Sequence, residues 1–116
     1  MMQIRKVYKE INPELLYHEV RDFTRRRGGT LAESKMETYS LPSDSSSFIS
    51  SGTLVFQMPD NKGTMKEAMR THIVGSAKGE TRLMMDIDDM VFPDQPLREL
   101  LEDLDFIFGS REVKKT

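Results

Sequence analysis

The sequence contains no cysteine, which excludes disulfide frameworks, cysteine-ligated zinc, iron–sulfur clusters and thiol catalysis. Long apolar runs are also missing, since none approaches the roughly 18 residues of a membrane span. The charged N-terminus lacks the apolar segment of a signal peptide. The net charge is only −2, so bulk charge does not favour nucleic acid as a partner. We therefore expect a soluble, cytoplasmic protein that binds neither nucleic acid nor membranes.

Familiar catalytic motifs are missing as well. The chain has no G-x-S-x-G, no H-E-x-x-H and neither of the glycine-rich phosphate loops. The only histidines are His18 and His72. We interpret His18 as part of a solvated ion pair with Glu14 or Asp22 on one helix face. His72 beside Asp86 resembles a base and the group that orients it, but no nucleophile accompanies them. The sequence thus leans against an enzyme and calls for no cofactor.

The chain length and composition favour a single domain. Its 116 residues are 37% hydrophobic and 31% charged, which is enough for one modest core. Two halves of about 58 residues would each be marginally stable. We expect one domain over residues 1–109 and a polar, flexible tail over residues 110–116.

Changes in hydrophobic periodicity predict seven elements. Residues 12–14 (Asn-Pro-Glu) are typical of a helix start, and residues 25–29 (three arginines and two glycines) are typical of its end. Leucines at helical spacing predict a second helix that Asp94 caps and that ends at Gly109. Alternating patterns predict strands at 2–11, 30–41, 48–58, 65–77 and 81–89, with a loop at 42–47.

The predicted order is therefore β-α-β-β-β-β-α. Two amphipathic helices and five strands indicate an α+β fold of two layers, with a mostly antiparallel five-stranded sheet packed against both helices. Gly52 interrupts an alternating strand, and we expect either a bulge or a close approach of another element there.

The pattern of the strands at 65–77 and 81–89 predicts how they pair. The apolar sets expected to face the core are all odd-numbered, namely Met65, Met69, Ile73 and Ala77 on the first strand and Leu83, Met85 and Ile87 on the second. Directly facing residues must therefore sum to an even number. With a three-residue connection or a bulge, Ile73 would lie opposite Met85. The outer-face pairs in this register are His72 with Asp86 and Arg70 with Asp88.

Asp86 and Asp88 are the best metal candidates in the sequence. On a strand their side chains point the same way, about 7 Å apart, which suits a hard cation. The predicted register, however, places basic side chains beside both carboxylates. We therefore favour a cross-strand ladder of salt bridges and predict no metal site.

Acidic residues are concentrated near the C-terminus. Residues 86–105 hold eight acids and one base. A solvated helix face explains this pattern, and the alternative is a surface that binds a second copy or a basic partner. Phe106 favours the alternative because it lies opposite the apolar stripe of the helix. The candidate interface residues are Phe106, Glu99, Glu102 and Asp103.

Nine methionines are many for this length. Methionine fills irregular space in cores, and it also suits adaptable apolar pockets. Core filling is the simpler interpretation, and an apolar cavity is the alternative. The candidate lining residues, all expected between the sheet and the helices, are Phe56, Met69, Met85, Leu101 and Phe108.

Both ends of the chain resemble one protein family. Residues 4–23 (IRKVYKEINPELLYHEVRDF) resemble the opening of START-like, helix-grip proteins of the polyketide cyclase type, in which a strand leads through a capping residue and a proline into a helix. Residues 79–83 (GETRL) and a leucine-rich helix after Pro96 resemble that family's ending. The resemblance implies a curved sheet that grips a helix around an apolar ligand cavity. The element order is also similar to the TATA-box-binding-protein-like arrangement.

Three functional hypotheses follow. The leading one is non-enzymatic binding of a small apolar ligand between the sheet and the closing helix. The alternative is a homodimeric or partner-binding module that uses Phe106 and the acidic helix face. An enzyme that uses His72 and Asp86 is the third.

Overall fold

The computed structural model describes residues 1–41, 44–76 and 78–113. The elements in chain order are β1 (Met2–Lys9), α1 (Pro13–Arg26), β2 (Thr30–Leu41), β3 (Asp44–Pro59), β4 (Met65–Gly75), β5 (Glu80–Ile87), α2 (Asp94–Phe108) and a short 3-10 turn, η1 (Gly109–Arg111). The predicted order β-α-β-β-β-β-α and the two-layer α+β class are confirmed.

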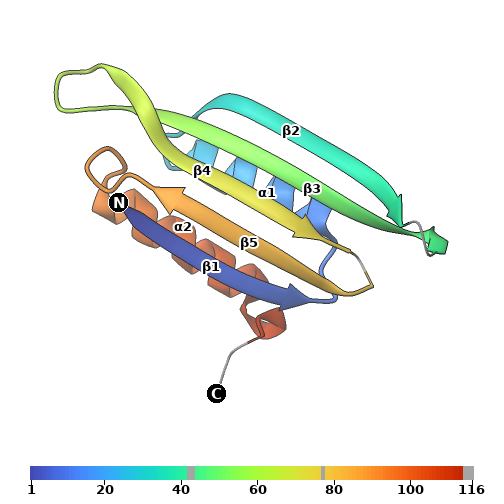
Figure 1. Ribbon diagram of the computed structural model, residues 1–116. Coiled ribbons are helices and arrows are strands. Elements are labelled where there is room, and N and C mark those ends of the chain that lie inside the picture. Colours follow the sequence, from blue (N-terminus) through green and yellow to red (C-terminus); the bar gives the residue numbers. More distant parts are fainter. Residues whose placement is uncertain (42–43, 77, 114–116) are drawn as a thin grey trace.

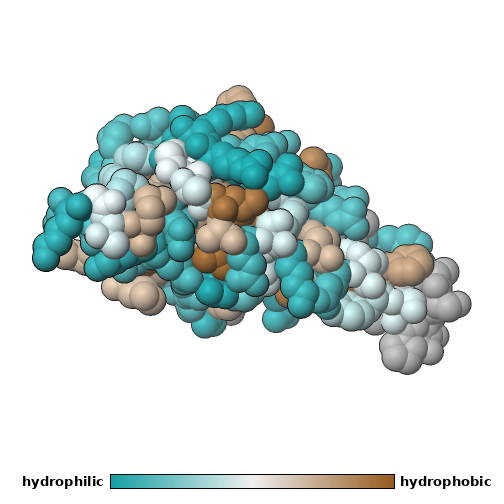
Figure 2. Space-filling view, turned by 90° about the horizontal axis from the view of Figure 1, so that it is seen from above, coloured by the Kyte–Doolittle hydropathy of each residue, from teal (hydrophilic) through white to brown (hydrophobic). Residues whose placement is uncertain are grey.

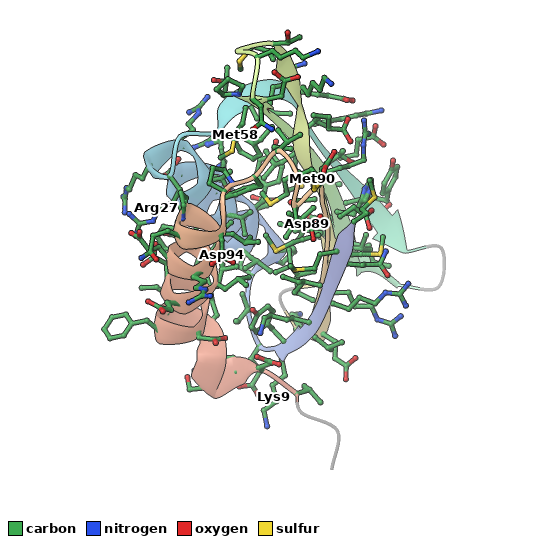
Figure 3. The ribbon with its side chains drawn as sticks, turned by 90° about the vertical axis from the view of Figure 1, so that its left-hand side faces the viewer. Lys9, Arg27, Met58, Asp89, Met90 and Asp94 are labelled. Carbon is green, nitrogen blue, oxygen red and sulfur yellow. The ribbon has the colours of Figure 1, made fainter. Side chains whose placement is uncertain are left out.

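The five strands form one antiparallel sheet in the order β1-β5-β4-β3-β2 (Figure 1). Figure 3 looks along the strands and shows both helices on the same side of the sheet. Among the residues that the structure describes, no helix covers the other side, which we call the open face, and β1 and β2 form the two edges. Neither helix of the described part combines the length and apolar character needed to cross a membrane.

The hydrophobic core fills the space between the sheet and the helices. Each helix contributes one apolar stripe, and the strands contribute every second residue except at the irregularity in β4, where the adjacent Ala68 and Met69 are both buried. The largest fully buried side chains are Tyr8, Leu16, Leu54, Phe56, Met69, Ile73, Leu83, Met85, Ile87, Phe92, Leu100 and Leu104. Burial of these side chains is the main force that holds the two layers together.

The ends of α1 follow the predicted chemistry, whereas the start of α2 does not. The backbone N–H of Glu14 donates to Asn12 Oδ1 at 2.8 Å, so Asn12 caps α1. The prediction that Asp94 caps α2 is wrong, because the capping position is Pro93 and no side chain bonds there. Asp94 lies in the first turn and pairs with Arg98 at 3.0 Å.

The hairpin between β2 and β3 is longer than predicted. β3 begins at Asp44, so the predicted loop is wrong over residues 44–47, and its residues 42 and 43 lie outside the described residues. Serine-rich sequence resembles a loop, but backbone pairing with β2 does not depend on apolar side chains. β4 ends at Gly75, and residue 77, predicted as its last, also lies outside the described residues.

The predicted register of β4 and β5 is wrong by two residues. Ile73 lies opposite Leu83, and Met85 lies opposite Thr71. The observed outer-face pairs are Arg70 with Asp86 and His72 with Met84, in place of Arg70 with Asp88 and His72 with Asp86. A shift by two preserves the face to which each side chain points, so the inner face predicted for Met69, Ile73, Leu83, Met85 and Ile87 remains correct. The prediction that Met65 faces the core is wrong, because the register irregularity of β4 opposite Phe56 and Gln57 turns that end of the strand over and leaves Met65 44% exposed.

Close packing at the end of β4 explains the shift. Gly75 lies opposite Thr81, and a Cβ on Gly75 would come within 2.5 Å of the Thr81 Cα. The Thr81 hydroxyl donates to the carbonyl of Ile11 at 2.8 Å, which ties β5 to the segment before α1. These contacts determine the register between β4 and β5, and the alternation of apolar residues does not indicate them.

Gly52 is a point of close approach. A Cβ at this position would lie 2.6 Å from the Tyr17 Cδ2, so the absence of a side chain lets α1 pack directly on β3. The register irregularities of β3 lie elsewhere, between Phe56 and Gln57 and near the two ends of β2. The close-approach alternative is therefore confirmed, and the bulge alternative is wrong.

The segment after α2 contacts β1. The backbone N–H of Val113 donates to the carbonyl of Val7 at 2.7 Å, and Glu112 forms an isolated bridge with Tyr8. Part of the β1 edge is thus covered by residues that we assigned to the tail. The flexibility of that tail stays a prediction, and residues 114–116 lie outside the described residues.

Candidate functional site

The five residues predicted to line a ligand cavity lie between the sheet and the helices, as expected. Phe56, Met69 and Met85 are at most 1% exposed, Phe108 is buried, and Leu101 packs against the same cluster from its rim. These side chains occupy the space in which the ligand was expected. A ligand there would require them to move apart, and its binding between the sheet and α2 stays a prediction.

The predicted interface residues are arranged in two groups. The Phe106 side chain is 88% exposed and Glu102 is exposed beside it. Glu99 and Asp103 instead face α1, where the Arg27 guanidinium lies 3.4 Å from Glu99 Oε2 and 2.8 Å from Asp103 Oδ2. Arg27, labelled in Figure 3, therefore neutralises part of the acidic face within the same chain. Use of this face as an interface stays a prediction.

The remaining sequence candidates are not brought together. His72 Nδ1 lies 3.3 Å from the Thr53 hydroxyl, and Asp86 Oδ1 accepts from Gln3 Nε2 at 2.7 Å. Asp88 Oδ1 accepts from the backbone of Met90. Within residues 1–41, 44–76 and 78–113, no cluster of three or more histidine, aspartate or glutamate side chains is placed to hold a metal ion.

The open side of the sheet carries a hollow that sequence reasoning did not find. It has a volume of about 1100 Å³ and lies over β1, β5 and β4, on the face toward the viewer in Figure 1. A smaller hollow of about 330 Å³ shares Val74, Glu80 and Arg82 with it and extends toward Ile49 on β3. We call the two together the open-face groove.

Six outward-facing side chains form the floor of the open-face groove. They are Arg5 and Val7 from β1, Arg82 and Met84 from β5, and His72 and Val74 from β4. The register places Arg5, Met84 and His72 in one cross-strand row. The next row contains Val7, Arg82 and Val74. Polar and apolar side chains therefore alternate in both directions, and each arginine has an apolar residue directly opposite.

The two arginines of the groove are available for an anion. Arg5 and Arg82 are exposed and occupy diagonal positions on neighbouring strands, where Cα atoms are about 7–8 Å apart. Arg5 Nε donates to Gln3 Oε1 at 2.8 Å, which leaves its terminal nitrogens free of that bond. In the described part of the chain, no carboxylate forms an ion pair with either arginine. Guanidinium groups bind carboxylates through paired hydrogen bonds.

The apolar side chains of the groove lie on the solvent side of the sheet, outside the hydrophobic core. Val74 is 43% exposed, and Val7 and Met84 are half-buried. The solvent face of an antiparallel sheet is normally polar. Val7, Met84 and Val74 surround Arg82, and binding pockets combine apolar side chains with a few polar groups that orient the ligand. The groove therefore offers apolar contact beside two arginines, with the carboxylates of Glu80 and Glu112 also in its lining.

A half-buried polar cluster borders the groove at the β1 edge. Lys6 Nζ lies 3.1 Å from Glu112 Oε1 and 3.3 Å from Asp105 Oδ1. Burial lowers the pKa of Lys6, but the bonds to Glu112 and Asp105 outweigh it and raise the pKa above its ordinary value. Burial, together with the same two carboxylates, raises the pKa of the Tyr8 hydroxyl. This cluster attaches the end of α2 to β1 and holds Glu112 at the groove rim.

The groove was missed for a physical reason. Two of its six floor side chains, Arg5 and Val7, join the others only through the pairing of β1 with β5, whose residues are far apart in the sequence. The sequence indicated which side chains of each strand point outward, but not which strands are neighbours. Alternating arginine and apolar residues at 5–7 and 82–84 were the only local signal.

Comparison with known proteins identifies no relative. No family model matches the chain, and no curated protein or solved structure is significantly similar to it. The resemblance of the chain ends to helix-grip proteins therefore stays a prediction.

Proposed function

We propose that this chain is a small, non-enzymatic binding domain whose ligand is an amphipathic carboxylate held in the open-face groove. The observation that carries this proposal is the pair of exposed arginines, Arg5 and Arg82, set among Val7, Val74 and Met84. The carboxylate lies between the two guanidinium groups. The apolar tail lies over the three apolar side chains.

We favour a ligand site on the open face over a ligand site in the core. The core side chains Phe56, Met69 and Met85 are fully packed, so a ligand there would have to separate them. The larger hollow of the open-face groove already provides a volume of about 1100 Å³ without any rearrangement. Binding sites are usually largely formed before the ligand arrives.

Most of the affinity should come from apolar contact. Ion pairs at exposed positions contribute only about 0.2–1 kcal/mol each. A fully buried methylene contributes about 0.8 kcal/mol, which is close to a fourfold change in Kd. Because the groove is half open, each added methylene should tighten binding by at most about fourfold. The arginines then set the orientation and the preference for an anion.

Titration calorimetry with hexanoate, octanoate and decanoate tests the proposal. We expect Kd to fall with chain length, and we expect octanol to bind more weakly than octanoate. Arg82→Gln should weaken octanoate binding, and Met84→Glu should weaken it further because it places a negative charge on the groove floor.

Arg98→Gln is the matched control, since Arg98 is an exposed arginine on α2, outside the groove. This variant should bind octanoate as the wild type does. Equal binding by Arg82→Gln and the wild type, or no dependence on chain length, would contradict the proposed site.

A further inference from the structure

The two edges of the sheet differ in how they are protected. At β1, Glu112 and Val113 lie along part of the strand and occupy the carbonyl of Val7. At the other edge, β2 is twelve residues long and pairs only with β3 within the described residues. Figure 2 views the molecule from the side of β2 and shows a largely hydrophilic surface with a small apolar area. An uncovered edge strand presents unpaired backbone groups that can pair with another strand.

Side chains on β2 alternate in charge along the open face. Glu33, Lys35 and Glu37 all point to that face, since their partners on β3 are Val55, Thr53 and Ser51. Lys35 Nζ lies 2.6 Å from Glu37 Oε1 within the strand. Met36 points to the helix side and is only partly buried. A strand with this pattern is complementary to a reversed copy of itself.

We infer that β2 pairs antiparallel with β2 of a second copy of this chain, with Met36 opposite Met36 of the second copy. In this register Lys35 of each copy lies opposite Glu37 of the other copy. The twofold axis creates this opposite-charge pair twice. Ser34 faces Thr38 of the other copy, so polar hydroxyl side chains meet on the helix side. The two five-stranded sheets become one continuous sheet.

The neighbouring registers are less favourable. With Lys35 at the twofold axis, Lys35 would oppose itself and Glu33 would oppose Glu37. With Glu37 at the axis, Glu37 would oppose itself. Like charges directly opposite on a sheet are destabilising, whereas opposite charges contribute about 0.2–1 kcal/mol per pair. With Ser34 at the axis, Glu33 would also oppose Lys35, but the irregularity between Leu31 and Glu33 would lie two residues from the axis instead of four. Charge complementarity and a regular ladder around the axis together favour the register centred on Met36.

The test uses two single variants and their mixture. In Lys35→Glu, carboxylates oppose each other across the axis. In Glu37→Lys, ammonium groups oppose each other. We expect the wild type to become dimeric in sedimentation velocity between about 1 µM and about 1 mM, and each variant to remain monomeric over that range. An equimolar mixture of the two variants should dimerise, because each new charge then faces its opposite on the other copy.

Controls separate this interface from a folding defect and from the other predicted interface. Both substituted positions lie on the exposed edge strand, and circular dichroism should show unchanged folding. Phe106→Ala, on the helix side of the molecule, should leave association unchanged. A wild type that stays monomeric at 1 mM, a mixture that stays monomeric, or loss of association in Phe106→Ala would each overturn the inference.

Discussion

The contact between Gly52 and Tyr17 gives a sharp test of how α1 packs on the sheet. Gly52→Ala would place a Cβ 2.6 Å from Tyr17 Cδ2 and 3.0 Å from the end of Met36. Ordinary carbon contacts begin near 3.4 Å, so the ring would have to move by about 0.8 Å. Tyr17 is 4% exposed and is held by α1, which leaves the ring little space in which to move.

Two opposing effects determine how much Gly52→Ala changes the free energy of unfolding. Overpacking of a core contact costs about 1–3 kcal/mol. Replacing glycine by alanine also reduces the entropy of the unfolded chain, which returns about 0.4–1 kcal/mol. We therefore expect Gly52→Ala to lower the free energy of unfolding by about 1–2 kcal/mol, a large part of the stability of a domain of this size.

Urea unfolding followed by circular dichroism measures this change. Gly79→Ala is the matched control, because its nearest non-neighbouring atom would be 4.0 Å from the new Cβ and its backbone is not strained. It should be neutral or slightly stabilising. Adding Tyr17→Leu to Gly52→Ala should cost less than the sum of the two single changes. Full stability of Gly52→Ala would refute the proposed packing of α1 on β3.

Two further predictions concern stability. Asn12→Ala should lower the free energy of unfolding by about 0.5–2 kcal/mol in urea titrations, because it removes the side-chain cap of α1, and Asn12→Asp should retain the cap and most of the stability. The pKa values of Lys6 and Tyr8 are both raised in the folded state. Their contribution to the free energy of unfolding is therefore complete below pH about 10 and is lost as the pH rises further. The urea midpoint should therefore be lower at pH 11 than at pH 9. This decrease should be smaller in Tyr8→Phe, whose lost hydroxyl has no hydrogen-bond partner within the described residues. A midpoint that rises over this range would contradict the assignment.

The fold was predictable because its signals are local. The cap at Asn12 and the leucine spacing of α2 each lie within one element, and alternation assigned the inner faces correctly except at Met65, beyond the irregularity in β4. The register of β4 and β5 was not predictable, because it depends on the contact of Gly75 with Thr81 and on the bond from Thr81 to Ile11. The odd numbering of the inward-facing residues restricts the sum of two facing residue numbers to even values, but it does not choose among those values.

The candidate site was less predictable than the fold. Sequence reasoning placed Met69 and Met85 between the sheet and the helices, and this placement is correct. It did not indicate that the space between the layers would be filled, or that Arg5 and Arg82 would be brought together by pairing of distant strands. Features that depend on long-range pairing require the three-dimensional structure.

Methionine methyl NMR tests the central claim, that the open face and not the packed core binds the ligand. Met84 lies on the floor of the open-face groove, whereas Met69 and Met85 are fully buried on the other side of the sheet. When octanoate is added to protein labelled at the methionine methyl groups, the Met84 signal should shift in a saturable way. The Met69 and Met85 signals should stay in place. Shifts at Met69 and Met85 with an unchanged Met84 would contradict the account and would place the ligand between the sheet and the helices.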